Sequence, residues 1–147
     1  MRIKIEVDTD PTLGFEVEKQ YIKEPIPVSI TSVVKSDLFA SKLHAALFRA
    51  WKNRVKGRDW YDVIWFISKE VPLNLSYFTT CMRELNEWSE SGIMTPQQVV
   101  GLVSERIDML DIETAKQDVI PFLKNPVIID EWTKDYFKHW INRMEFC

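Results

Sequence analysis

The spacing of the apolar residues changes once along this chain, near residue 36, and this change limits the possible folds more than any other feature. Residues 3–8 alternate aliphatic and charged side chains, which is the period-two pattern of a half-buried β-strand. Residues 15–19 alternate in the same way, and residues 28–34 are rich in β-branched side chains, so both are predicted strands. We therefore expect a small antiparallel β-sheet within residues 1–35.

From residue 36 onward the pattern is helical, and residues 36–147 are expected to form a helical bundle. Ser36 or Asp37 can cap the first helix, because either side chain can accept hydrogen bonds from the free N–H groups of the first turn. The predicted helices cover residues 37–53, 59–70 and 76–91, a fourth that opens at Thr95-Pro96, and two more over residues 111–123 and 129–144. The expected fold class is α+β.

Length and composition exclude several classes of protein. A chain of 147 residues suits one domain, and no segment is apolar for long enough to span a bilayer. The N-terminus lacks the pattern of a secretory signal. The two cysteines, Cys81 and Cys147, form neither a disulfide framework nor a metal-binding spacing. These features predict a reduced, cytoplasmic protein without a membrane partner.

Positive charge is concentrated in residues 38–58, although the whole chain has a formal net charge of −3. This segment contains six Lys or Arg residues and no acidic residue. A local excess of positive charge in an acidic protein predicts contact with an anion at that place. The net charge disfavours binding of bulk nucleic acid and leaves a local phosphate contact open.

Lys42 and Arg49 lie on one narrow face of the first predicted helix, with Ala45 at the same azimuth, beside the apolar face. In one interpretation the two cations reach a phosphate chain, and the small alanine leaves room for its approach. In the other, this is a solvated polar face, as in most amphipathic helices. The helical wheel alone does not decide between them.

Asp59 and Asp62 open the second predicted helix, directly after Arg58. As N-cap and third helical residue they would satisfy free amides and interact favourably with the helix dipole, without any ligand. The rest of that helix is apolar nearly all round and should be buried. A carboxylate at its start is therefore either paired with a cation or part of a functional site, and the spacing leaves both open.

Glu6 and Asp8 are two residues apart in the first predicted strand, so their side chains point to the same face. Two carboxylates so placed can share a hard divalent cation such as Mg²⁺, which neutralises charge in phosphoryl transfer. The alternative is the solvated face of an amphipathic strand. The six tryptophans are spread along the helices at packing positions, and only Trp51 and Trp60 flank the basic loop between the first two predicted helices.

Taken in order, the segments Ile3–Asp8, Asp37–Ala45 and Lys56–Asp62 resemble the AbiEii-type nucleotidyltransferase toxin family, over nearly the whole chain. The resemblance implies that Lys42 contacts the nucleotide phosphates, with Arg49 and Arg58 also in the nucleotide site. It implies that Asp59 is an active-site carboxylate. Glu6, or Asp8 one pleat later, would be the strand acid near Mg²⁺.

The family's activity would be transfer of a nucleotide from a nucleoside triphosphate to an RNA or other macromolecular acceptor. The chain would be the toxin of a toxin–antitoxin pair of the abortive-infection type, with an antitoxin protein as partner. The β part would then belong to a nucleotidyltransferase core. The alternative is a non-catalytic helical module that binds RNA or a protein, since phosphate-directed binding explains the basic segment equally well.

One departure from the family pattern leads to further expectations. The family's first motif, a Gly-Ser turn followed by a D-x-D strand, should precede residue 1. We therefore expect this chain to be a C-terminal portion with little or no transferase activity alone. The first strand would lack its usual neighbours, and an open aliphatic edge predicts self-association through residues 1–8.

Overall fold

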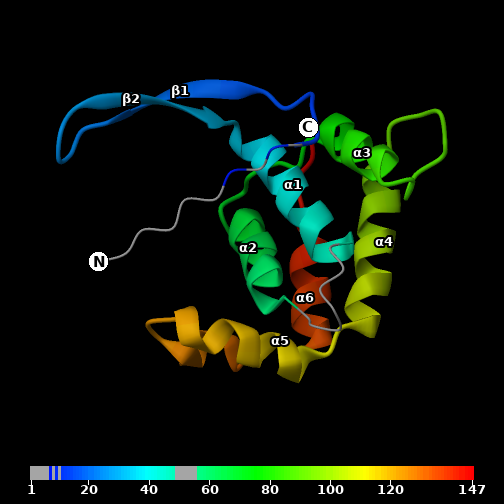
Figure 1. Ribbon diagram of the computed structural model, residues 1–147. Helices are drawn as coiled ribbons and strands as arrows, with labels where there is room; N and C mark the ends of the chain where they lie inside the picture. Colours follow the sequence, from blue (N-terminus) through cyan, green and yellow to red (C-terminus); the bar gives the residue numbers. More distant parts are fainter. Residues whose placement is uncertain (1–6, 8, 10, 49–55) are drawn as a thin grey trace.

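The described part of the chain folds into a β-hairpin followed by a set of helices (Figure 1). The computed structural model describes residues 7, 9, 11–48 and 56–147. In chain order its elements are β1 (Val17–Ile22), β2 (Val28–Val33), α1 (Lys35–Phe48), α2 (Gly57–Ser68), α3 (Leu75–Glu84), α4 (Pro96–Met109), α5 (Ile112–Val119), the 3-10 helices η1 (Ile120–Phe122) and η2 (Pro126–Ile129), and α6 (Lys134–Ile141). The predicted α+β class is confirmed. Of the strand predicted over residues 3–8, only Val7 lies within the described residues.

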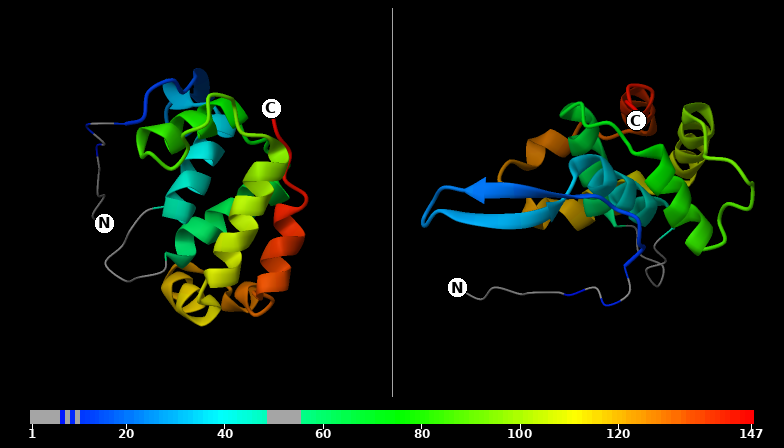
Figure 2. Two further views of the ribbon diagram at one scale, coloured as in Figure 1. Left: turned by 90° about the vertical axis from the view of Figure 1, so that its right-hand side faces the viewer. Right: turned by 90° about the horizontal axis from the view of Figure 1, so that it is seen from above.

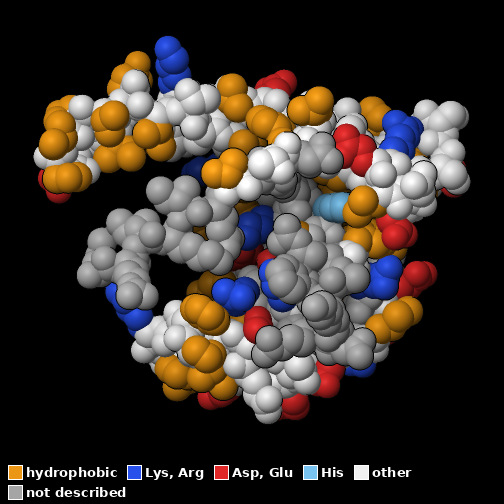
Figure 3. Space-filling view, viewed as in Figure 1, with side chains coloured by type: hydrophobic (Ala, Val, Ile, Leu, Met, Phe, Trp, Pro, Cys, Tyr) orange, Lys and Arg blue, Asp and Glu red, His pale blue; other side chains and the backbone are white. Residues whose placement is uncertain are grey.

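The hairpin projects away from the helices, and the seen-from-above view of Figure 2 shows this most clearly. Its strands are antiparallel, and Val17 pairs with Val33 at the base and Ile22 with Val28 at the tip. Nearly all of its side chains are exposed, so apolar groups cover much of the projecting end in Figure 3. A two-stranded hairpin on its own is only marginally stable in water. The last residues of β2 lead directly into α1, which ties the hairpin to the helical part.

The helices pack around a shared core rather than in a regular bundle. α1 packs on α2 and α3, α2 also contacts α5 and α6, and α4 lies against α6. The ring of Phe39 on α1 stacks on that of Phe66 on α2, with centroids 5.1 Å apart. Trp132 and Phe137 meet edge to face at 5.0 Å in the part of the core formed by α6. No helix in the described part of the chain is long and apolar enough to cross a membrane.

Local sequence explains where α4 begins and which face it buries. Thr95 accepts a hydrogen bond from the backbone N–H of Gln98, whose side chain accepts one from the backbone N–H of Thr95. This is a capping box, and Pro96 follows at the position where its missing N–H costs nothing. Val99, Val103 and Ile107 recur every four residues and are fully buried, as an apolar helix stripe should be.

Two predicted helix boundaries are wrong. The third helix ends at Glu84 instead of Ser91, because Asn86 takes a positive φ of 58° and the Arg83 guanidinium donates hydrogen bonds to carbonyls of the following loop. The last helix begins at Lys134 instead of Ile129. The side chain of Thr133 caps it by accepting a hydrogen bond from the N–H of Tyr136 at 3.0 Å.

Candidate functional site

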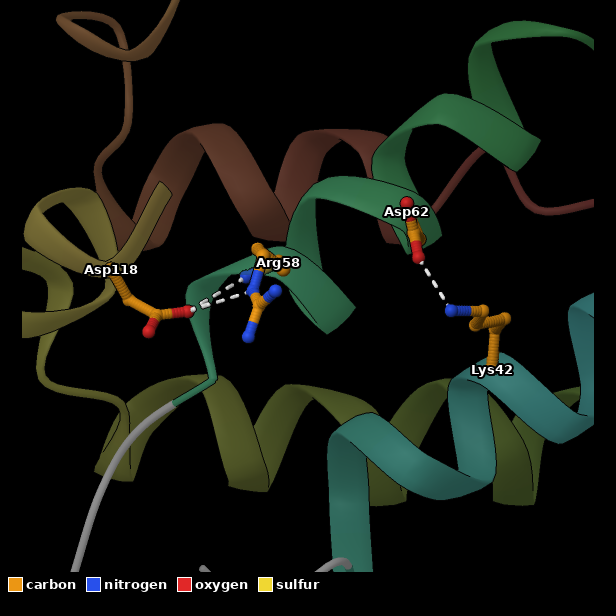
Figure 4. A network of polar contacts seen from close by, with 4 residues as sticks. All are labelled: Lys42, Arg58, Asp62 and Asp118. Atoms are coloured by element: carbon orange, nitrogen blue, oxygen red, sulfur yellow. Dashed lines mark hydrogen bonds and ion pairs between the residues drawn. The ribbon is translucent and has the colours of Figure 1, made fainter. Parts of the chain in front are cut away.

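Lys42 and Asp62 join α1 to α2 across the surface of the helical part (Figure 4). The Nζ atom of Lys42 lies 2.8 Å from Oδ2 of Asp62, and each side chain is 38% exposed. The packing of Phe39 on Phe66 holds the two helices together behind this pair. A partly exposed ion pair of this kind stabilises a fold by about 0–1 kcal/mol. The ammonium group therefore stays accessible to a stronger anion.

Asp59 lies on α2 one turn before Asp62, and it is only 6% exposed. Its Oδ2 atom is buried, and no group in the described part of the chain donates a hydrogen bond to it. A buried acceptor without a donor costs roughly 1–3 kcal/mol, so most such atoms are bonded in folded proteins. Asp59 is thus a buried carboxylate with a free oxygen, three residues from the ion pair.

The interpretation of Asp59 as the N-cap and Asp62 as the third helical residue, one of the two left open by the sequence, is wrong. Lys56 is the N-cap residue of α2, without a side-chain capping bond, and Asp59 follows inside the first turn. Asp62 lies in the second turn, where it bonds Lys42 instead of free backbone amides. Lys42, which the family resemblance places in the same site as Asp59, is therefore paired with Asp62, on the same helix.

Arg58 points the other way, toward α5 (Figure 4). Its Nε atom lies 3.7 Å from Oδ2 of Asp118, to which its backbone N–H also donates a hydrogen bond at 3.4 Å. The guanidinium carbon lies 4.4 Å from the centre of the Phe122 ring, which adds a cation–π contact. Arg58 thus helps to fix the start of α2 on α5.

Gly57 explains why α2 can begin so close to α5. A Cβ atom at this position would lie 1.9 Å from the carbonyl oxygen of Ala115, so only glycine allows this approach. The close contact places Arg58 and Asp59 firmly against the rest of the fold. The Lys56-Gly57-Arg58-Asp59 segment is therefore a rigid start to the helix that carries both aspartates.

A comparison with protein families shows the family to which the chain belongs. The family model described as "Nucleotidyl transferase AbiEii toxin, Type IV TA system" matches residues 1–145. The chain belongs to this AbiEii family. No curated protein and no solved structure matches it. Membership of this toxin–antitoxin family implies an antitoxin partner and a nucleotide substrate.

Membership of a nucleotidyltransferase family implies use of a divalent metal ion, which needs a set of side-chain ligands. No group of three or more His, Cys, Asp or Glu side chains within residues 7, 9, 11–48 and 56–147 is arranged to hold one. Asp62 is already paired with Lys42. Among the carboxylates of this site, only Asp59 then remains as a metal ligand. These residues do not form a metal centre by themselves.

Three predicted site residues lie outside the described residues. These are Glu6 and Asp8, predicted near Mg²⁺, and Arg49, predicted beside the phosphates. The self-association predicted through residues 1–8 also falls mainly on such residues. Their roles stay predictions.

Sequence reasoning missed the part played by Asp37, which was considered only as a helix cap. It lies inside the first turn of α1, is fully buried and accepts three hydrogen bonds. The donors are the backbone N–H of Glu16 at 2.6 Å, the side-chain amide of Asn74 at 2.7 Å and the hydroxyl of Ser36 at 3.4 Å. Asp37 therefore connects the entry to the hairpin, α1 and the start of α3, and its role is structural.

Proposed function

We propose that the junction of α1 and α2 binds the phosphate chain of a nucleoside triphosphate, with Lys42 as the contacting cation. The observation that supports this proposal is the weak, half-exposed ion pair between Lys42 and Asp62, held at the surface by two packed helices. The chain would then transfer a nucleotide to an RNA or other macromolecular acceptor, as the toxin of its pair.

The physical argument rests on competition between two anions for one ammonium group. Asp62 orients Lys42, but the exchange with a phosphate requires little free energy because the existing bridge is worth about 0–1 kcal/mol. A triphosphate offers more negative charge and several acceptor oxygens, so its charge-assisted bonds are stronger. Arg58 would add a smaller contribution, since Asp118 and Phe122 already engage its side chain.

Asp59 is proposed as the active-site carboxylate of the same site. Its buried oxygen without a donor favours this role over a structural one, because a purely structural carboxylate would be fully bonded. The proposal includes Mg²⁺ with Glu6 and Asp8 as its carboxylate ligands, and no catalytic step is assigned to the ion here. Action in the cytoplasm, where nucleoside triphosphates and RNA are present, completes the proposal.

A nucleotide-binding measurement tests the role of Lys42. Titration calorimetry with each of the four nucleoside triphosphates, with and without Mg²⁺, gives the dissociation constants. Lys42→Ala should weaken binding roughly tenfold or more, because a hydrogen bond to a charged group is worth about 1.5–3 kcal/mol. Glu6→Gln and Asp8→Asn should remove the part of the affinity that depends on Mg²⁺.

The chain offers a matched control for this variant. Lys138 on α6 forms a similar bridge between helices, with its Nζ atom 2.6 Å from Asp108 and its side chain 36% exposed. Lys138→Ala removes the same kind of ion pair without touching the proposed site, so nucleotide affinity should be unchanged. Equal affinity in the Lys42→Ala and Lys138→Ala variants would contradict the proposal.

The second candidate function is a module that binds RNA or a protein without chemistry. The concentration of Lys and Arg in residues 38–58 favours it, since phosphate attraction alone explains such a segment. Strong, salt-dependent RNA binding that survives both Lys42→Ala and Asp59→Asn, with no affinity for nucleotides, would support this function instead.

A further inference from the structure

An aromatic cavity lies between α2, η2 and α6. Its volume is about 170 Å³. Tyr61 and Trp65 line it from α2, and Tyr136 and Trp140 line it from α6. Trp132 and Ile128 complete the lining. The sequence spreads its tryptophans over separate helices, but the fold brings three of them to one place.

The two walls of the cavity have the same construction. Tyr61 and Trp65 are four residues apart on α2, and Tyr136 and Trp140 are four residues apart on α6, so each pair lies on one face of its helix. Trp132 is almost completely buried, whereas Trp65 is 42% exposed. The cavity is therefore an aromatic slot that opens to the surface along Trp65, and it is not a sealed gap in the core.

The cavity has few polar groups, and these can form hydrogen bonds with a ligand. In the described part of the chain no hydrogen bond engages the hydroxyl of Tyr61 or of Tyr136. The hydroxyl of Ser68, which also lines the cavity, donates to the carbonyl oxygen of Trp65 at 2.8 Å and can still accept a bond. A mainly aromatic lining with a few hydrogen-bonding groups at its edge is typical of sites for flat, polar-edged rings.

We propose that this cavity binds a nucleobase, and the proposal rests on the nucleotide-binding function proposed above. Size supports a single flat ring system, because an apolar cavity of roughly 150 Å³ is large enough for benzene. Aromatic side chains stack on every base, since each base has a flat π face. The base belongs either to the bound nucleoside triphosphate or to the single-stranded end of the acceptor RNA.

The position of the cavity links it to the phosphate site. Tyr61 is the residue before Asp62 in α2, and Trp65 follows Asp62 by three residues, or about 4.5 Å along the helix axis. The aromatic wall therefore begins within one helical turn of the pair between Lys42 and Asp62. Both sites are therefore on α2, and their nearest residues are within about one helical turn of each other.

Ligands that carry only half of a nucleotide separate the two sites. Dissociation constants are measured for nucleosides, for inorganic triphosphate, for nucleoside triphosphates and for a short single-stranded RNA. Trp65→Ala should weaken nucleoside binding roughly tenfold, as expected for the loss of one stacked base, and leave triphosphate binding unchanged. Lys42→Ala should do the reverse. If the phosphate proposal is wrong, the triphosphate measurement shows it. The nucleoside measurement still tests the cavity independently.

The two sources of the base give different results. A base of the substrate predicts weaker binding of nucleoside triphosphates in Trp65→Ala, and a base of the acceptor predicts weaker binding of the RNA alone. Trp65→Phe should restore much of the lost affinity, because the phenyl ring keeps a flat face. Tyr21→Ala removes an aromatic ring from the hairpin that is 76% exposed, and it should change nothing.

Trp65 is largely exposed, so its variants should fold, and circular dichroism checks this directly. Unchanged affinity of Trp65→Ala for nucleosides, nucleoside triphosphates and RNA would overturn the proposal. The absence of any nucleoside affinity in the unmodified protein would overturn it as well, and the cavity would then fit an apolar side chain of a protein partner.

Discussion

Asp37 and Asp59 occupy equivalent places on two neighbouring helices. Each lies in the first turn of its helix and each is buried, with exposed fractions of 0% and 6%. Asp37 accepts three hydrogen bonds from the chain, whereas one oxygen of Asp59 is buried without a donor in the described part of the chain. Burial alone therefore does not separate a structural carboxylate from a functional one. The difference lies in whether the fold supplies hydrogen-bond donors to the carboxylate oxygens.

The largest expected effect is the loss of stability in Asp37→Ala. The substitution leaves the buried N–H of Glu16 and the side-chain amide of Asn74 without an acceptor, and it removes two short bonds to a charged group. We expect the free energy of unfolding to fall by about 3 kcal/mol or more. Urea unfolding followed by circular dichroism measures it.

Asp37→Asn keeps the shape of the side chain and one acceptor oxygen, so its effect should be about half as large or less. A loss below about 1 kcal/mol in Asp37→Ala would mean that the three bonds contribute little to stability, and the contrast with Asp59 would fail.

Asp59→Asn should have a much smaller effect on stability, in either direction, of about 1 kcal/mol or less. In the described part of the chain no group donates a hydrogen bond to Oδ2, so little bonding is lost and an unpartnered negative charge is removed. Mg²⁺-dependent nucleotide binding should nevertheless fall strongly if this carboxylate acts in the site. The two measurements, unfolding in urea and titration calorimetry with a nucleoside triphosphate, are made on the same preparation.

A destabilisation of Asp59→Asn as large as that of Asp37→Ala would show that Asp59 is bonded within the fold and serves packing. Full stability together with full Mg²⁺-dependent nucleotide binding would remove Asp59 from the proposed site.

The contrast between the two aspartates also explains what the sequence could predict. The helical positions of Lys42 and Asp59 follow from apolar periodicity, which is local information. The partners of Asp37 are 21 and 37 residues away in the chain, so a local pattern allows only a capping role. The pairing of Lys42 with Asp62 depends on how α1 crosses α2, and the gathering of three tryptophans depends on how η2 and α6 return to α2. Tertiary packing decides these contacts.

Asp111 extends the comparison to a carboxylate that is bonded but not buried, and it carries the smallest expected effect. Its side chain caps α5 and accepts hydrogen bonds from the backbone N–H of Thr114 at 3.0 Å and from the Thr114 hydroxyl at 2.8 Å. These bonds favour the ionised form, so the pKa of Asp111 is lowered from its ordinary value of 3.8. The carboxylate therefore stabilises the fold fully above this value, and the contribution is lost as the pH falls through the lower pKa of the folded state.

The unmodified protein should accordingly be more stable than Asp111→Asn at neutral pH, and the difference should shrink as the pH falls below 3.8. Thermal unfolding of both proteins between pH 7 and the acid limit of the fold measures it, with Asp130→Asn as the exposed control. A difference that stays constant with pH would show that the charge of Asp111 does not matter and that its hydrogen bonds alone cap the helix. If the difference does shrink, bonding without burial is enough to lower a carboxylate's pKa in this protein. Asp59 differs from both Asp37 and Asp111, because one of its oxygens accepts no hydrogen bond from the described part of the chain and can accept one from a ligand.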